Sequence, residues 1–370
     1  MRLISLLFAA SIILSGCAAN PAISLDVDEQ VWPSSATALA GIAANPLPSA
    51  RANAATLTDK RFVTSDGTAL PLCAWVPDEA PRAVVLALHG FNDYSNAFAV
   101  PGPAFARHGI LTYAYDQRGF GAGPNHGRWA GQDKMVGDAV EAARLLRRRH
   151  PDLPLYVMGE SMGGAVAILA ASGTATTAPA DVDGVILVAP AVWGRQTMNM
   201  FERAGLWLAD LMPSLHVSGS DLPITVMPSD NLPMLRAFNA DPFVIKETRA
   251  DAVAGLVDLM SSALDAAPRF AAPALILYGE RDEIVPRPPV ARMVANLPRS
   301  AGTRQRVAFY PRGYHMLMRD LSGDVVIDDA IAWIENHKAS LPSGLDRGAR
   351  TTLAGGGSSA GPRFAAAELP

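Results

Sequence analysis

The sequence predicts an α/β protein with a mostly parallel, doubly wound sheet and an inserted helical cap. Three observations lead to this prediction. Short, nearly continuous apolar runs recur along the chain, and strands covered on both faces need that composition. Helical patterns separate these runs, as right-handed crossover connections require. The interval of 82 residues between "GVILVAP" and "PALILYG" is too long for one crossover helix, so it indicates an insertion.

The composition is that of a globular enzyme. The chain has 370 residues, of which 49% are hydrophobic and 18% charged. That length holds one large domain with an insertion, or two modest domains. The formal net charge is -4, which gives no reason to expect a nucleic-acid partner.

The first 17 residues form a targeting segment. "MRLISLLFAASIILSGC" carries one arginine and an apolar stretch too short for a comfortable membrane span. Its ending, "LSGC", resembles the lipobox of bacterial lipoproteins, which implies lipidation at Cys17 and a membrane anchor. Ala18, rather than an aspartate, follows the cysteine, so the resemblance implies the outer membrane, facing the periplasm. An ordinary secretory signal with an incidental cysteine is the alternative.

Composition also divides the rest of the chain. Residues after the cysteine are rich in Ala, Pro and Ser, and the last residues are rich in Gly, Ala and Ser. With Cys17 lipidated, Cys73 has no cysteine partner for an internal disulfide. It lies in the apolar run "LPLCAW", where a buried, inert thiol is expected. The expected parts are a signal peptide (1–17), a tether with an irregular lead-in (18–58), a core (59–193 and 268–340), a cap (194–267) and a disordered tail (341–370).

The predicted strands and helices follow in order. A hairpin, "RFVTSDGTALPLCAWV", turns at Asp66-Gly67. Because a doubly wound sheet collects reactive groups at the carboxyl ends of its strands, functional side chains are expected just after the strands. Apolar runs predict strands at 83–88, 110–115, 155–158, 184–189, 274–278 and 306–310, and helical patterns predict helices at 95–107, 133–149, 161–172, 287–297 and 324–338.

Ser161 stands between a predicted strand and a predicted helix, in "YVMGESMGGAVAI". A sharp strand-to-helix turn lifts a serine hydroxyl above the sheet, and flanking glycines are needed where backbones pack closely. The G-x-S-x-G pattern alone is weak, because "GSSAG" at 357–361 also satisfies it. That second copy lies in the low-complexity tail with no strand before it, so Ser161 is the candidate nucleophile.

A serine nucleophile needs partner groups, and the ends of three other predicted strands supply them, one before Ser161 in the chain and two after it. "LALHGFNDYS" places His89-Gly90 at a strand end, where His89 is expected to hold the loop. The amides of Phe91 and Met162 could face one another as an oxyanion hole. "VAFYPRGYHMLMRD" presents His315 as the base, and "LYGERDEIVP" presents Asp282 as the acid, with Glu280 and Glu283 as rivals.

With these motifs in place, the chain resembles the α/β-hydrolase superfamily, and within it the monoacylglycerol lipase and lysophospholipase group, also described as the serine aminopeptidase type. The resemblance covers about residues 61–338. It implies the α/β-hydrolase fold, a Ser161-Asp282-His315 triad, and hydrolysis of single-chain lipid esters without a cofactor. The motifs that carry it, in order, are "HGFNDYS", "YDQRGFGAG", "GESMGGAVAI", "APAVW", "LILYGERDEIVP" and "YHMLMRD".

Other sites are less defined. In the cap, Met198, Phe201 and Trp207 are expected to bind the acyl chain, although packing against the core explains such residues equally well. No metal-ligand spacing is visible, and no Gly-rich phosphate loop follows the first strand. The glycines of "YDQRGFGAGPNHG" are expected to form a loop near the site.

Three functions remain open from the sequence. The first is a carboxylic ester hydrolase acting on monoacylglycerol or lysophospholipid. The second keeps the fold and cleaves amides as an amidase or aminopeptidase, with cap carboxylates such as Glu202, Asp210, Asp221 and Asp230 to hold an amine. The third is a non-catalytic lipid-binding lipoprotein, which the presence of all three triad residues disfavours.

Overall fold

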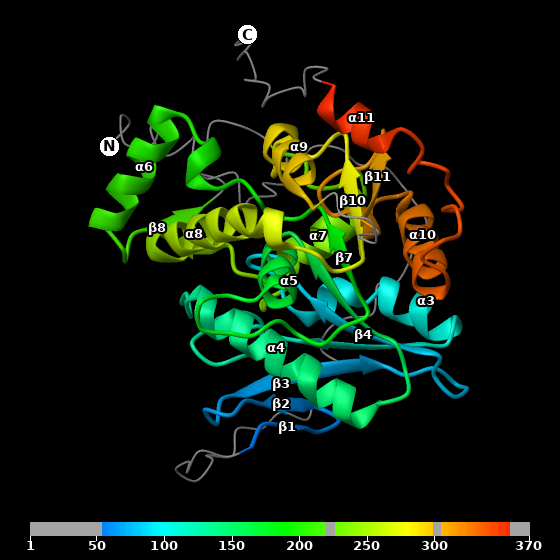
Figure 1. The fold of residues 1–370 in the computed structure, drawn as a ribbon. Coiled ribbons are helices and arrows are strands. Elements are labelled where there is room, and N and C mark those ends of the chain that lie inside the picture. Colours follow the sequence, from blue (N-terminus) through cyan, green and yellow to red (C-terminus); the bar gives the residue numbers. More distant parts are fainter. Residues whose placement is uncertain (1–53, 219–225, 299–304, 356–370) are drawn as a thin grey trace.

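A nine-stranded sheet runs through the middle of the computed structural model, which describes residues 54–218, 226–298 and 305–355 (Figure 1). Its strand order is β1-β2-β3-β5-β4-β6-β7-β10-β11. The strands are β1 (Thr56–Leu57), β2 (Arg61–Val63), β3 (Ala69–Trp75), β4 (Ala83–Leu88), β5 (Ile110–Tyr115), β6 (Leu155–Glu160), β7 (Gly184–Val188), β10 (Ala274–Gly279) and β11 (Gln305–Tyr310).

The sheet is parallel from β5 to β11, and the amino-terminal hairpin adds to it antiparallel through β3. The register brings the carboxyl ends of the parallel strands level. Leu88 pairs with Gly159, and Gly279 pairs with Tyr310. The loops that follow β4, β6, β10 and β11 therefore meet at one edge of the sheet, where the sequence predicted the reactive groups.

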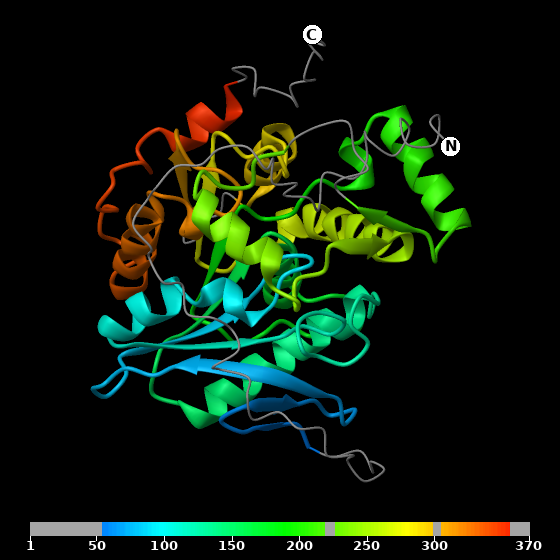
Figure 2. The same cartoon turned by 180° about the vertical axis from the view of Figure 1, so that it is seen from behind.

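Helices cover both faces, which is why the strands are apolar throughout: every residue of β4, β5, β6, β7 and β10 is buried. Val84 and Leu86 face a cluster with α4, α5, α8 and α9, while Val85 faces a cluster with α3 and α10. Figures 1 and 2 show these opposite sides. The core helices are α3 (Pro101–Arg107), α4 (Gln132–Arg149), α5 (Met162–Ser172), α9 (Arg287–Asn296) and α10 (Gly323–Glu335).

The helix predicted at 95–107 is divided in two. A short 3-10 helix, η1 (Ser95–Phe98), precedes α3, which begins at Pro101. Proline has no amide hydrogen to donate, so it is disfavoured inside a helix but suits the first turn. The spacing of apolar residues along the sequence did not by itself reveal this break.

The predicted cap contains α6 (Met200–Leu211), β8 (His216–Ser218), α7 (Leu232–Ala240), β9 (Glu247–Arg249) and α8 (Ala250–Ala266). Of these, α8 packs against α5 with Leu256, Val257 and Met260 buried, so it serves as the crossover helix of the core between β7 and β10. In contrast, α6 presents Met200 and Trp207 to the surface. Within the described ranges, no helix has both the length and the apolar character needed to cross a membrane.

The carboxyl-terminal segment differs from the predicted disorder. Residues 341–355 are ordered and include α11 (Ala349–Ala354), while residues 356–370 lie outside the described residues. Leu353 is buried against the core, and Arg287 donates to its carbonyl oxygen at 3.0 Å. Composition suggested a solvated tail, but three apolar side chains, Leu341, Ala349 and Leu353, reach the hydrophobic clusters. The lead-in also contains order, because β1 pairs with β2.

The packing of α11 generates a stability prediction. Leu353 is 1% exposed, so Leu353→Ala should lower the free energy of unfolding by about 2–5 kcal/mol, measured by chemical denaturation. Leu321, which is 70% exposed, is the matched control, and Leu321→Ala should change it by no more than about 0.5 kcal/mol. Equal effects at both positions would show that α11 does not pack on the core in solution.

Candidate active site

Ser161 occupies a strained turn between β6 and α5. Its backbone has φ 52° and ψ −115°, a conformation that a residue with a Cβ rarely adopts. The turn is held in place from both sides, since Ser161 N donates to Val188 O at 2.9 Å and Ala191 N donates to Ser161 O at 2.9 Å. Strain of this kind persists only where the surroundings determine it, and it presents the hydroxyl at the strand ends.

The two glycines around Ser161 are required by close backbone approach. A Cβ on Gly159 would lie 2.2 Å from the carbonyl oxygen of Gly163. A Cβ on Gly163 would lie 2.0 Å from the carbonyl oxygen of Leu88, at the end of β4. The elbow therefore packs directly on the neighbouring strand, as the sequence pattern predicted.

The side chains of Asp282 and His315, the predicted acid and base, lie together beyond the strand ends. Asp282 follows β10, His315 follows β11, and His315 Nδ1 lies 2.8 Å from Asp282 Oδ2. The other carboxylate oxygen of Asp282 accepts hydrogen bonds from the amides of Ile284 and Val285 at 2.8 and 2.9 Å. Both side chains are buried. With the carboxylate fixed in this way, Nδ1 of the ring carries the proton and Nε2 is left to act as a base.

The rival acids have other surroundings. Glu280 is exposed at the surface, and Glu283 accepts a hydrogen bond from the amide of Met227 at 2.9 Å. The structure therefore joins His315 to Asp282, the residue that the family resemblance implied.

The pKa of His315 is raised above its ordinary value. Burial by itself disfavours the charged ring, but the carboxylate of Asp282, through charge and hydrogen bond, outweighs burial, and Glu160 adds to the effect. Arg319 acts in the opposite direction. The net result is a ring that accepts a proton more readily than a free histidine.

The predicted oxyanion residues flank Ser161. A Cβ on Gly90 would lie 3.4 Å from the Cβ of Ser161, so the loop that carries Phe91 runs beside Ser161. Met162 is the first residue of α5, and the amide of a first helical residue has no carbonyl in its own helix to donate to. These positions suit the predicted role, which stays a prediction.

His89 holds this loop, as expected. Its Nε2 accepts from the amide of Gln117 at 2.9 Å, so its Nδ1 carries the hydrogen and donates to Gly90 O at 2.8 Å. Complete burial lowers its pKa. Both ring nitrogens are therefore engaged with backbone, and His89 is not a second base.

Cap residues clasp both loops of the site. Asn92, just after Phe91, donates from Nδ2 to the hydroxyl of Thr248 in β9 at 2.7 Å. Near His315, the amide of Met316 donates to Pro228 O at 2.9 Å, and Ser229 donates from Oγ to Asp320 Oδ1 at 2.7 Å. The loops after β4 and β11 are thus fixed by the chain that covers them.

The structure separates the three predicted acyl-binding residues. Met198 is buried in the core cluster, whereas Trp207 is 64% exposed on α6. The side chain of Phe201 lies outside what the structure describes. Their shared role stays a prediction.

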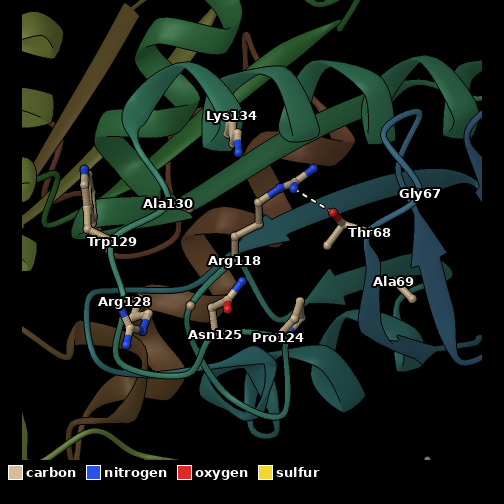
Figure 3. Close-up of a pocket in the computed structure, with 11 residues that line it drawn as sticks. Gly67, Thr68, Ala69, Arg118, Pro124, Asn125, Arg128, Trp129, Ala130 and Lys134 are labelled. Atoms are coloured by element: carbon tan, nitrogen blue, oxygen red, sulfur yellow. Dashed lines mark hydrogen bonds between the residues drawn. The ribbon is translucent and has the colours of Figure 1, made fainter. Parts of the chain in front are cut away.

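A pocket of about 560 Å³ lies beside the loop "YDQRGFGAGPNHG" (Figure 3). Arg118 reaches from this loop to Thr68, donating at 2.7 Å, and also pairs with Asp138 at 2.6 Å and Asp66 at 2.9 Å. Its guanidinium is therefore committed to tying the loop to the hairpin and α4. Trp129, just after this loop, lines the same pocket and lies with its ring centroid 6.4 Å from that of Phe91. Phe120, inside the loop, lies 5.6 Å from the same ring, so the loop packs against Phe91, a predicted oxyanion residue.

The sequence analysis missed one residue that links these loops. Arg319, in the 3-10 helix η5 (Leu317–Arg319), pairs with Glu160 at 2.7 Å and with Asp93 at 2.8 Å. Glu160 directly precedes Ser161. The signal was present, because Glu160 and Arg319 stand inside "GESMGG" and "YHMLMRD", but spacing alone could not pair them.

Comparison with known proteins identifies the family. A family pattern described as serine aminopeptidase, S33 matches residues 79–322. The chain belongs to this Hydrolase_4 family. The monoacylglycerol lipase of Mycolicibacterium smegmatis is 27% identical over 291 residues, covering 76% of this chain and 98% of that protein. The monoglyceride lipase of Homo sapiens is 24% identical over 291 residues, covering 75% and 91%.

Solved structures agree on the fold. The Paleococcus ferrophilus monoacylglycerol lipase superposes with a TM-score of 0.59 at 21% identity, over 73% of this chain and 99% of that chain. A soluble variant of the Saccharomyces cerevisiae monoglyceride lipase, in complex with a substrate analog, gives 0.62 at 18% identity, over 80% and 100%. The predicted α/β-hydrolase fold is confirmed, and with the family match so is the expectation of a carboxylic ester hydrolase.

No three His, Cys, Asp or Glu side chains gather as a metal site in the part of the chain that the structure describes.

The elbow generates a second stability prediction. Gly163→Ala should cost about 1–3 kcal/mol or more in the free energy of unfolding, because the new Cβ overlaps Leu88 O. Gly137, inside α4 with nothing within 4 Å of an added Cβ, is the matched control. Gly137→Ala should stabilise the protein by about 0.5–1 kcal/mol. A neutral Gly163→Ala would contradict the close approach of β4 and α5.

Proposed function

We propose that the chain cleaves carboxylic esters of single-chain lipids, monoacylglycerols or lysophospholipids, through an acyl-serine intermediate on Ser161. The observation that carries this proposal is the His315–Asp282 pair at the strand ends that also present the strained Ser161. Relatives named monoacylglycerol or monoglyceride lipase support the substrate class.

The first half of the proposed reaction acylates the serine. His315 Nε2 takes the hydroxyl proton while Ser161 Oγ attacks the ester carbonyl carbon. The carbonyl oxygen becomes an oxyanion that accepts hydrogen bonds from the amides of Phe91 and Met162, and one such donor is worth about 10²–10³ in rate. As the tetrahedral intermediate collapses, His315 gives its proton to the departing alkoxide, and a glycerol or glycerophosphate alcohol leaves.

The second half returns the enzyme to its starting state. A water molecule gives a proton to His315 Nε2 and adds to the acyl carbon through its oxygen. Collapse of the second oxyanion breaks the Ser161 ester, His315 returns the proton to Oγ, and a fatty acid departs. Asp282 keeps its negative charge throughout, holding the ring in the correct tautomer and stabilising the imidazolium.

Amide hydrolysis is the second candidate, because the family description names an aminopeptidase. The cap carboxylates that would hold a substrate amine have partners. Asp210 lies 3.9 Å from Arg195, Asp230 accepts from the amide of Leu321, and Glu202 accepts from the amide of Asn199. Asp221 lies outside the described residues. Turnover of an ester beside that of its matching amide separates the two candidates.

We also propose that the chain is a lipoprotein of the bacterial cell envelope, anchored through a diacylglyceryl group on Cys17 and facing the periplasm from the outer membrane. Residues 1–53 lie outside the described residues, so the sequence alone supports this proposal. Each buried CH₂ of the lipid contributes about 0.8 kcal/mol to membrane attachment. Metabolic labelling with a palmitate analogue should be lost in Cys17→Ser.

The catalytic role of Ser161 is tested directly on protein beginning at residue 18. Wild-type protein should hydrolyse p-nitrophenyl esters and be labelled by a fluorophosphonate, and Ser161→Ala should abolish both because no other activated hydroxyl is proposed. Ser358→Ala, in the second G-x-S-x-G copy, is the matched control and should leave both unchanged. Labelling that survives Ser161→Ala would place the nucleophile elsewhere.

The raised pKa of His315 gives the pH dependence. Only the neutral ring can accept the serine proton, so kcat/KM should rise with pH and reach half its plateau above the ordinary histidine value of about 6.5. The measurement is a profile of kcat/KM against pH with an ester of fixed chain length. A midpoint below 6.5 would mean that burial outweighs Asp282.

A further inference from the structure

A buried guanidinium connects three loops of the site. Arg319 lies four residues after His315, and its side chain is only 8% exposed. One terminal nitrogen, Nη1, contacts Asp93 Oδ2 at 2.8 Å, and the other, Nη2, donates to Glu160 Oε1 at 2.7 Å. One side chain from the β11 loop thus reaches the loop after β4 and the end of β6.

Each partner stands next to a group with a proposed role. Glu160 is bonded through one peptide to Ser161, and Asp93 follows Phe91 by two residues. Asp93 Oδ1 also accepts from the amide of Tyr94 at 2.8 Å, which fixes the carboxylate in its own loop. A shift of the guanidinium would therefore be felt at the nucleophile and at the oxyanion loop together.

The arginine itself is held firmly. Its amide donates to Met316 O at 2.7 Å, its carbonyl accepts from Asn231 Nδ2 at 3.0 Å, and the guanidinium carbon lies 5.7 Å from the centroid of the Phe238 ring. The neighbouring Asp320 accepts from the amide of Tyr314, just before His315, at 2.8 Å. These contacts tie the loop that carries His315 to the segment that carries Arg319.

We propose that Arg319 is a positioning residue that sets the distance between Ser161, the ring of His315 and the amide of Phe91 by holding Glu160 and Asp93 at once. This inference rests on the proposed function. A planar guanidinium can hold two carboxylates in fixed directions, whereas the single ammonium of a lysine cannot. A displacement of 1 Å in such a site can cost about 10²-fold in rate.

Arg319 also contributes charge. The charged groups around His315 in the described chain are Asp282, Glu160 and Asp320, which favour the protonated ring, and Arg319, which opposes it. Loss of the positive charge leaves the carboxylates unopposed. The acid limb of the kcat/KM profile should then move to higher pH.

Two substitutions in the full-length protein separate geometry from charge. Arg319→Lys keeps the charge, so the pH midpoint should stay near that of the wild type while kcat falls by about 10²-fold with KM within about threefold. Arg319→Ala loses both, so kcat should fall at least as far and the midpoint should rise. Labelling of Ser161 by the fluorophosphonate should slow in parallel in both variants.

Arg287 provides a matched control. It is also a buried arginine, but it donates to the carbonyl oxygens of Leu353 and Gly355 at 3.0 and 2.7 Å and so holds α11. Arg287→Lys should lower Tm and leave kcat and the pH midpoint of the folded protein unchanged. A role for Arg319 in stability alone would give this same pattern.

A wild-type kcat in Arg319→Lys would overturn the proposal. A loss of activity that equals the unfolded fraction, with the labelling rate per folded molecule unchanged, would overturn it too. If Arg319→Ala does not fold, Asp93→Asn replaces it, since it releases only the oxyanion loop and should lower kcat without changing KM; wild-type kcat there would overturn the proposal equally. Failure of the proposed function is separate, because wild-type protein would then neither turn over esters nor be labelled.

Discussion

The close approach of three backbones at the end of β6 is the constraint on which the site depends. Gly159, Gly163 and the end of β4 lie so near one another that no Cβ fits between them, and Ser161, in the same turn, has a positive φ. Neither feature stabilises the chain. The apolar clusters on both faces of the sheet supply the free energy that keeps this turn in place.

Around this turn the chain buries charge that an ordinary core avoids. Asp282, His315, Glu160, Asp93 and Arg319 all lie out of solvent at one edge of the sheet. The free energy needed to remove two charges from water can exceed the Coulomb attraction between them, so buried charges need hydrogen bonds of good geometry as well. Backbone amides provide them for one carboxylate oxygen each of Asp282 and Asp93, and Phe238 of the cap lies beside the guanidinium of Arg319. The buried charged groups at the strand ends and the cap therefore pack against each other.

The sequence predicted where the core strands lie and where the elbow turns, because an apolar run and a pair of glycines are local patterns. The choice of Asp282 over Glu280 and Glu283 as the partner of His315 came from the family resemblance, and the two side chains lie within hydrogen-bond distance. The sequence did not predict the Arg319 network, since residues 93, 160 and 319 meet only in three dimensions. It also assigned α8 to the cap and 341–355 to a disordered tail. In both cases the composition resembled that of the neighbouring segment, so it gave no boundary. The boundary is set by long-range packing, of α8 against α5 and of α11 against α9.

The ordered carboxyl-terminal segment has a consequence for the outermost strand. An edge strand exposes a row of unpaired amides and carbonyls, a template for joining another chain. β11 is such a strand, and the amide of Phe309 donates to Leu345 O while Arg350 donates to Gln305 O. The segment thus occupies the positions that a neighbouring molecule would use, and it shields from self-association the very strand that delivers His315.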